Sequence, residues 1–185
     1  MLAGAAHAHK VNFCKFTNET RNAMEAAEVD SGQKYIAAVR GACAGGGYEL
    51  ALACNYIMLV EDGSSTVALP EVPLLAVLPG TGGLTRLTDK RQVRRDLCDV
   101  FCAMEEGVRG QRARDWRLVD EVVPNSKFDE TVTERAKKFA AAAPRPAATG
   151  IALTPLRRNI ADDGSIAYST IEVAMDRAKG VATIT

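Results

Sequence analysis

The sequence predicts an α/β fold, and two observations carry this prediction. Two short apolar segments, residues 35–40 and 56–60, have the length of buried strands and are bounded by turn-forming residues. Between them lies a glycine-rich stretch and then an apolar segment, residues 48–54, that is typical of a short helix. A strand–helix–strand order favours parallel strands joined by right-handed crossovers.

The elements before and after this unit follow from capping and turn residues. Thr17 or Asn18 is expected to cap a helix that runs to about Asp30 and closes at Gly32. Residues 41–47 are expected to form a loop.

The middle of the chain is predicted to be mostly loop. Pro70, Pro73 and Pro79 break up the stretch that follows a short third strand at residues 66–69. Beyond it, the spacing of apolar residues predicts three helices and then a strand, at residues 81–88, 92–104, 110–114 and 119–123.

The C-terminal part predicts a change of domain. Ser126 is expected to cap a helix over residues 128–143, after which the composition shifts to proline and alanine. Alternating residues near the C-terminus predict a β-hairpin, which is marginally stable alone. We therefore predict a domain at residues 1–143, a linker at 144–167 and the start of a second unit at 168–185.

Composition and charge exclude several classes of function. Lys and Arg number 23 and Asp and Glu number 23, so the formal net charge is zero and no electrostatic footprint for nucleic acid is present. No apolar run reaches the roughly 18–20 residues of a membrane span, and the N-terminus is not a signal peptide. No membrane or nucleic-acid partner is expected.

The cysteines indicate free thiols. Their number is odd, no CxxC pair occurs, and they are Cys14, Cys43, Cys54, Cys98 and Cys102. This pattern predicts neither a disulfide framework nor a metal site, and it fits a reducing cytoplasm.

Gly45, Gly46 and Gly47 form the strongest local motif, because they lie where a strand feeds a helix. Unpaired N–H groups at a helix start bind oxyanions, and glycine lets a ligand approach them. A tight turn with close helix–strand packing explains the same glycines equally well. Glu49, within an apolar helix, is either a partner of the helix dipole or an acid–base group beside the anion site.

Glu71 is the second carboxylate of interest. It lies between prolines in an apolar stretch, either aimed at a site or exposed on a loop. Two carboxylates in different environments titrate apart, so Glu49 and Glu71 would be able to divide acid and base roles. The PGTGG run at residues 79–83 lacks the Lys-Ser/Thr of a P-loop, and we expect it to open a helix beside Glu71.

These motifs, in this order, resemble the crotonase (enoyl-CoA hydratase/isomerase) superfamily. The resemblance covers about residues 35–143 and implies acyl-CoA substrates, a backbone oxyanion hole and two catalytic glutamates. By position, Gly46 would supply one oxyanion-hole N–H, and Glu49 and Glu71 would be the acid–base pair. The residues expected around the substrate are Gly45, Gly46, Gly47, Cys43, Pro70, Leu75 and Gly80.

A narrower resemblance is to lyases of aerobic benzoate degradation through CoA thioesters. Residues 9–22, 69–86 and 106–120 carry it. It implies water-dependent opening of an epoxidised benzoyl-CoA ring with release of formate and no redox cofactor. An aliphatic enoyl-CoA hydratase/isomerase remains an alternative. So does a non-catalytic fragment that binds acyl-CoA or forms an oligomer interface.

Departures from the family pattern predict an N-terminally truncated portion of a longer enzyme. The family's first oxyanion-hole N–H and first strands belong to a segment that would precede Met1, so we expect a ββα spiral core without them. Residues 168–185 resemble the opening strands of a second crotonase-like half. Asn55 stands where an aspartate is usual, and Arg40 where asparagine is frequent. The family's usual self-association implies a homo-oligomer.

Overall fold

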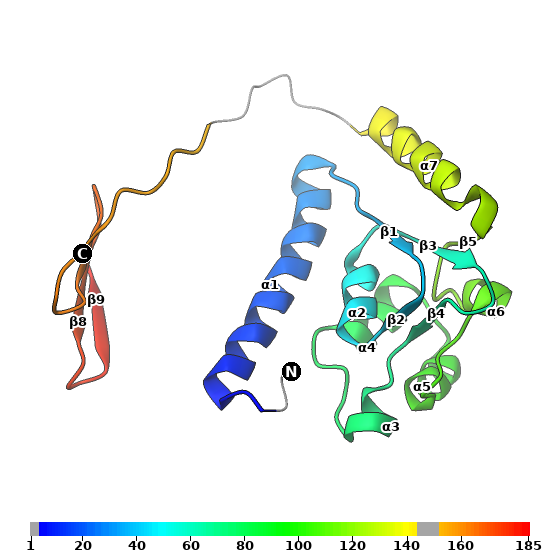
Figure 1. Cartoon of the computed structure of the whole chain (residues 1–185), viewed down its shortest axis with the longest axis horizontal. Helices are drawn as coiled ribbons and strands as arrows, with labels where there is room; N and C mark the ends of the chain where they lie inside the picture. Colours follow the sequence, from blue (N-terminus) through cyan, green and yellow to red (C-terminus); the bar gives the residue numbers. More distant parts are fainter. Residues whose placement is uncertain (1–3, 144–151) are drawn as a thin grey trace. The chain divides into compact units, whose positions relative to one another are not determined.

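The computed structural model describes residues 4–143 and 152–185. The chain divides into two compact units, residues 1–145 and 146–185, which are described separately (Figure 1).

Parallel strands form the centre of the first unit. Its strands are β1 (Ile36–Val39), β2 (Ala42–Ala44), β3 (Tyr56–Glu61), β4 (Thr66–Ala68) and β5 (Glu121–Pro124). One sheet has the order β1-β3-β5, the other pairs β2 with β4, and every pairing is parallel. The predicted α/β class with parallel strands is confirmed.

Strand β3 is buried on both faces, which explains its unbroken apolar sequence. Ile57 and Leu59 belong to the main core cluster. Met58 and Val60 point to the opposite face, into a second cluster with Phe128 from the last helix of this unit. A strand between two cores has no reason to alternate between apolar and polar residues.

Helices cover these sheets (Figure 1). They are α1 (His7–Ser31), α2 (Gly46–Ala53), α3 (Glu71–Leu75), α4 (Gly83–Thr85), the π-helical turn η1 (Arg86–Lys90), α5 (Arg95–Ala103), α6 (Gly110–Asp115), the 3-10 turn η2 (Asn125–Lys127) and α7 (Phe128–Ala142). Helix α1 packs against α2, the helix that the glycine motif opens.

The predicted start of the first helix is wrong. Helix α1 begins ten residues earlier, at His7 rather than at Thr17. The Thr17 hydroxyl donates to the carbonyls of Phe13 and Cys14, so it bonds back along the helix instead of capping it. The predicted end is confirmed, because Gly32 adopts a left-handed conformation with φ 68°.

Three other local predictions need correction. Residues 42–44 of the expected loop form β2, which pairs with β4. The proline-rich stretch holds α3, since Pro73 falls within its first turn, where no intrahelical N–H bond is lost. Ser126 does not cap the last helix, because it lies within η2 and α7 begins after Lys127 without a side-chain cap.

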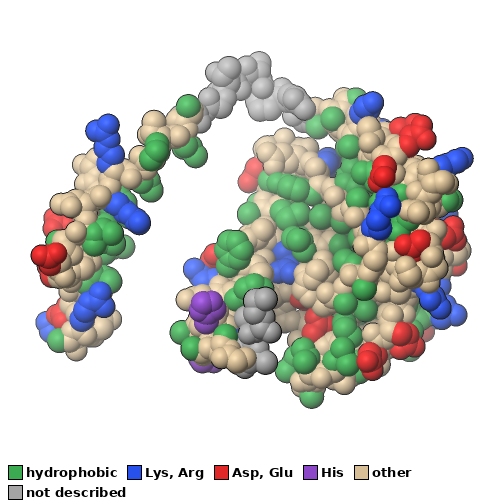
Figure 2. Space-filling model, in the orientation of Figure 1, with side chains coloured by type: hydrophobic (Ala, Val, Ile, Leu, Met, Phe, Trp, Pro, Cys, Tyr) green, Lys and Arg blue, Asp and Glu red, His purple; other side chains and the backbone are tan. Residues whose placement is uncertain are grey.

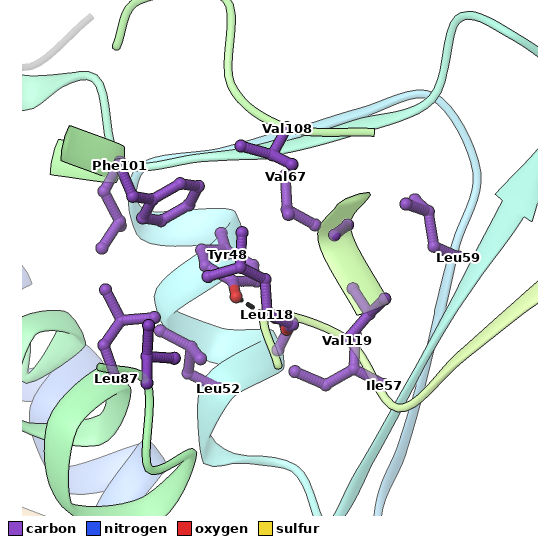
Figure 3. Close-up of a cluster of buried hydrophobic side chains, with 14 of the residues drawn as sticks. Tyr48, Leu52, Ile57, Leu59, Val67, Leu87, Phe101, Val108, Leu118 and Val119 are labelled. Carbon is purple, nitrogen blue, oxygen red and sulfur yellow. Dashed lines mark hydrogen bonds between the residues drawn. The ribbon is translucent and has the colours of Figure 1, made fainter. Parts of the chain in front are cut away.

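Tyr48 lies at the centre of the main core. It is fully buried, packs edge-on against Phe101 with ring centroids 5.7 Å apart, and donates a 2.7 Å hydrogen bond to the Leu118 carbonyl. Figure 3 shows this bond among the apolar side chains around α2. The bond joins α2 to the segment that leads into β5.

We expect Tyr48→Phe to lower the free energy of unfolding by about 1–3 kcal/mol, because the buried Leu118 carbonyl loses its donor. Urea denaturation followed by circular dichroism measures this. Tyr35→Phe is the matched control, since its hydroxyl bonds the exposed Gln33 side chain, and a change below about 0.5 kcal/mol is expected. Equal losses from both variants would contradict a special contribution of the buried bond.

The second unit is a small antiparallel sheet in the order β6-β7-β8-β9. Its strands are β6 (Asn159–Ile160), β7 (Ile166–Ala167), β8 (Glu172–Asp176) and β9 (Val181–Ile184). The hairpin predicted at the C-terminus is β8–β9, with Val173 opposite Ile184. The predicted linker at 144–167 includes residues 144–151, outside the described residues, but it also contains β6 and β7.

Candidate active site

The candidate site is built around the N-terminus of α2. Strand β2 ends at Ala44, and Gly45 turns the chain with φ 55°, a conformation that favours glycine. A Cβ atom at Gly45 would lie 3.0 Å from Oε1 of Glu71, so this glycine also lets the carboxylate approach the backbone. The next residues, Gly46 and Gly47, are exposed, and the first N–H groups of a helix have no intrahelical partner.

Glu49 is buried and held as a hydrogen-bond acceptor. Its Oε1 accepts bonds from the backbone N–H groups of Thr81, at 3.0 Å, and Gly83, at 2.9 Å. The Thr81 hydroxyl donates to Oε2. A carboxylate oxygen has two lone pairs, so Oε1 is saturated and Oε2 keeps one free acceptor position.

Gly83 has no room for a side chain beside Glu49. A Cβ atom there would lie 2.9 Å from Oε1 of Glu49 and 3.2 Å from the Leu69 side chain. The PGTGG run thus opens α4 and places its N–H groups on Glu49. The prediction put this run beside Glu71, whereas its N–H groups donate hydrogen bonds to Glu49.

Glu71 has the opposite environment. It is the first residue of α3, it is half-buried, and its Oε2 is buried with no hydrogen-bond partner among the described residues. Burial raises the pKa of Glu71, and the charge of Glu49 raises it further. The two carboxylates that the sequence singled out are thus close enough to interact, and their hydrogen-bond environments differ.

Arg21 is the residue that sequence reasoning missed. It comes from α1, is 4% exposed, and its Nη2 donates a 2.6 Å bond to the Gly46 carbonyl. Burial lowers the pKa of Arg21, the charge of Glu49 raises it, and Arg86 lowers it. The only signal in the sequence is an arginine within a helix, which does not distinguish a buried guanidinium from a solvated one.

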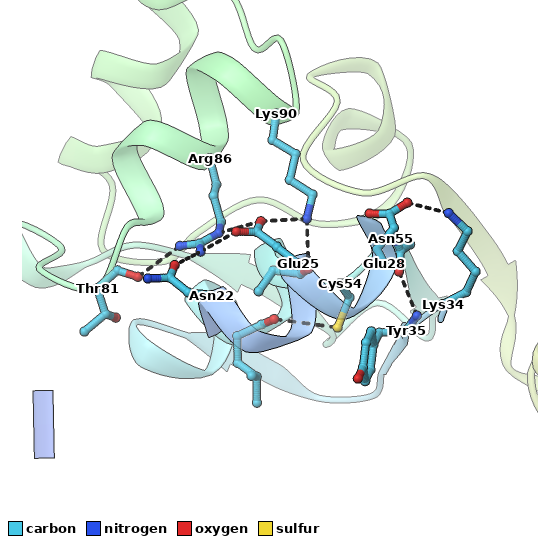
Figure 4. Close-up of polar contacts among 12 residues, drawn as sticks. Asn22, Glu25, Glu28, Lys34, Tyr35, Cys54, Asn55, Thr81, Arg86 and Lys90 are labelled. Carbon is cyan, nitrogen blue, oxygen red and sulfur yellow. Dashed lines mark hydrogen bonds and ion pairs between the residues drawn. The ribbon is translucent and has the colours of Figure 1, made fainter. Parts of the chain in front are cut away.

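A cluster of charged residues ties α1 to the chain segment that holds Glu49. Arg86 donates to both oxygens of Glu25, at 2.9 and 2.7 Å, and to the Thr81 carbonyl at 3.3 Å. Lys90 donates to Glu25 at 2.9 Å and to the Ala53 carbonyl at 2.8 Å. Figure 4 shows Arg86 and Lys90 converging on Glu25. These hydrogen bonds connect α1, the end of α2 and the Thr81 loop.

The remaining predicted binding residues lie apart from these contacts. Cys43 packs against the main core, and burial raises the pKa of its thiol to about 11. Pro70 precedes α3 as its N-cap residue, and Leu75 is 67% exposed. A Cβ atom at Gly80 would have only the Leu78 carbonyl within 4 Å, at 3.9 Å. The structure brings Gly45, Gly46, Glu49 and Glu71 together, but it gives Cys43, Leu75 and Gly80 no comparable contact.

A pocket of about 440 Å³ opens beside Glu49, between α1 and α2. Its walls are mostly apolar, with one arginine and one carboxylate among the lining residues Phe13, Phe16, Thr17, Thr20, Arg21, Gly46, Gly47, Glu49, Leu50 and Thr81. Its volume falls within the usual range of small-molecule binding sites.

Residues 4–143 and 152–185 contain neither a metal-binding cluster nor a membrane-spanning helix. No group of three or more His, Cys, Asp or Glu side chains there is arranged to hold a metal ion. None of the helices in these ranges has both the length and the apolar character needed to cross a membrane. On the face in Figure 2, basic and acidic side chains of the first unit are interspersed.

Comparison with curated proteins finds relatives of this chain. Benzoyl-CoA-dihydrodiol lyase of Aromatoleum evansii is 56% identical over 186 aligned residues, which cover 100% of this chain and 33% of that protein. The fatty acid oxidation complex subunit alpha of Idiomarina loihiensis is 37% identical over 116 residues, 63% of this chain and 16% of that protein. The chain thus spans a third or less of the length of these relatives.

Solved structures and a family model agree with this relationship. An enoyl-CoA hydratase from Geobacillus kaustophilus superposes with a TM-score of 0.65 at 36% identity, covering 75% of this chain and 50% of that one. An enoyl-CoA hydratase from Bacillus anthracis gives 0.63 at 32% identity, covering 76% and 51%. The family model described as enoyl-CoA hydratase/isomerase matches residues 6–178. The chain therefore belongs to the enoyl-CoA hydratase/isomerase family, the crotonase superfamily.

Proposed function

We propose that this chain carries the acid–base pair of an acyl-CoA lyase that opens the ring of an epoxidised benzoyl-CoA with water and releases formate. The observation that carries the proposal is the contrast between Glu49, which accepts three hydrogen bonds, and Glu71, whose buried Oε2 has none. The 56% identity to a protein named benzoyl-CoA-dihydrodiol lyase supports the substrate class.

The contrast assigns a role to each carboxylate. Glu49, which has hydrogen-bond donors on both oxygens, uses the free position on Oε2 to take a proton from water, and the resulting hydroxide attacks a carbon of the epoxide. Glu71, whose pKa is raised, gives its proton to the epoxide oxygen as the C–O bond breaks. Two carboxylates in unlike environments thereby perform opposite proton transfers.

Gly46 stabilises the charge that develops on the thioester in this mechanism. Its N–H, at the exposed start of α2, donates to the thioester oxygen and stabilises the negative charge that develops there. The thioester withdraws electrons from the ring, so the ring becomes a better target for water. Opening the epoxide with one water gives a diol, and cleavage of a carbon–carbon bond of the ring with a second water then releases formate. These steps need no redox cofactor, and CoA is part of the substrate. Self-association into a homo-oligomer and a cytoplasmic location stay predictions.

An aliphatic enoyl-CoA hydratase is the second candidate. The similarity to two enoyl-CoA hydratases, at 36% and 32% identity, favours it. The same two glutamates would add water across a carbon–carbon double bond, so the products distinguish the two candidates. Formate indicates ring opening, whereas a hydroxyacyl-CoA indicates hydration.

The test is to supply the chain with enzymatically generated epoxybenzoyl-CoA and, separately, with crotonyl-CoA. Formate release from the first substrate and no hydration of the second is the expected result. Calorimetric titration with benzoyl-CoA provides a binding control. Binding without either product would overturn the proposed activity for this chain and leave an acyl-CoA-binding module.

A further inference from the structure

Arg21 is an unusual residue for helix α1 to bury. It is the one buried side chain of this 25-residue helix, while Phe13 and Phe16 on the same helix are 47% and 67% exposed. An amphipathic helix normally buries apolar residues, and a buried guanidinium is costly unless its donors are paired. The buried N–H groups of Arg21 therefore need hydrogen-bond acceptors.

The protein supplies only part of that partner. Nη2 bonds the Gly46 carbonyl, but Nε and Nη1 are buried and have no hydrogen-bond partner among the described residues. Neither Glu49 nor Glu25 bonds Arg21, because Glu49 accepts hydrogen bonds from the Thr81 and Gly83 segment and Glu25 accepts from Arg86 and Lys90. Nε–H and Nη1–H point from different edges of the guanidinium, so each of these two donors remains available to its own acceptor from outside the chain.

The pocket between α1 and α2 adjoins the Arg21 guanidinium. Arg21 lines the 440 Å³ pocket between α1 and α2 together with Phe13, Phe16 and Leu50. A mostly apolar pocket with a single unsatisfied cation suits a ligand with an apolar body and one oxygen acceptor. Gly46 lines the same pocket. A substrate whose thioester oxygen accepts a hydrogen bond from the Gly46 N–H would therefore have its acyl group beside the apolar side chains of the pocket.

We propose that Arg21 contacts the substrate, and that Nη1 donates a hydrogen bond to an oxygen borne by the ring of an aromatic acyl group in this pocket. The inference rests on the proposed function and adds to it a residue that selects oxygenated rings over unsubstituted ones. A site that hydrogen-bonds a ligand oxygen discriminates against analogues lacking it, because its own donors are then left unpaired.

The test measures binding, so it does not depend on turnover. Calorimetric titration compares benzoyl-CoA, whose ring carries no oxygen, with 2-hydroxybenzoyl-CoA. The parent chain is expected to bind the hydroxylated thioester about ten- to a hundredfold more tightly. Arg21→Met should abolish this preference and change benzoyl-CoA affinity less than about threefold. Arg114→Met, at an exposed arginine of α6, is the matched control and should keep the preference.

Each outcome decides between the two proposals. Equal binding of both thioesters by the parent, or an unchanged preference in Arg21→Met, would overturn the role of Arg21 and leave the proposed function standing. A preference that disappears with Arg21, without formate release by the parent, would sustain this site and overturn the proposed activity. If Arg21→Met does not fold, Arg21→Lys keeps the charge and removes the planar guanidinium, and a preference fully retained in it would contradict the inference.

Discussion

Replacing Glu71 with glutamine is expected to lower kcat for formate release about 10²–10⁴-fold, because the amide cannot give a proton to the opening epoxide. Glutamine keeps the size of the side chain, so benzoyl-CoA affinity should change little. The residual rate should also lose its pH dependence. In the parent, kcat should fall as the pH rises through the raised pKa of Glu71, because the protonated donor disappears.

The same substitution should not destabilise the fold. A carboxyl whose pKa is raised by folding favours the folded state below its unfolded pKa, and this contribution is lost as the pH rises through the folded pKa. Glutamine cannot ionise, so above neutral pH Glu71→Gln should unfold at a urea concentration equal to or higher than the parent's. An inactive variant that is also clearly less stable would contradict the assignment of Glu71 as the proton donor.

The two substitutions Glu49→Ala and Glu49→Gln are expected to differ in their effect on the free energy of unfolding but to abolish activity alike. Alanine leaves the buried N–H groups of Thr81 and Gly83 without an acceptor, at a cost of about 1–3 kcal/mol for each. Glutamine still accepts both bonds through its amide oxygen, so its stability should stay within about 1 kcal/mol of the parent's. Both variants should lose formate release, since neither holds a carboxylate at Oε2.

Urea denaturation and the formate assay, run on both variants, check this prediction. Val29→Ala, at a residue of α1 that is 84% exposed, is the control and should change neither readout. Equal stability of the two Glu49 variants would show that the bonds from Thr81 and Gly83 do not hold the fold. Formate release by Glu49→Gln at the parent rate would exclude Glu49 as the base.

Apolar strands were the most predictable part of the fold. The segment that became β3 is buried on both faces, and a run of apolar residues reports that burial directly. The first helix was harder, because Thr17 is a good capping residue by type and yet bonds back to earlier carbonyls. Strand β2 was missed since its pairing with β4 depends on residues more than twenty positions away.

The candidate site was predictable where a motif carries its own chemistry. Glycines before a helix and acids in apolar surroundings marked Gly46, Glu49 and Glu71. Arg21 could not be identified from the sequence, because arginine is common in helices and only the tertiary packing of this chain buries Arg21. The contrast between the two glutamates also needed the structure, since the donors to Glu49 come from a distant segment and Oε2 of Glu71 has no partner among the described residues.

Tyr48 and Glu49 are adjacent in the chain, yet one belongs to the core and the other to the site. Successive side chains on a helix point about 100° apart, so α2 serves both surfaces at once. A change that rotates or slides this two-turn helix disturbs the packing and the carboxylate together. Natural variation in substrate range is therefore expected to accumulate on α1, whose aromatic side chains line the pocket without anchoring the core. Substitutions on α1 can then change which substrates fit the pocket, while the sequence of α2 stays the same.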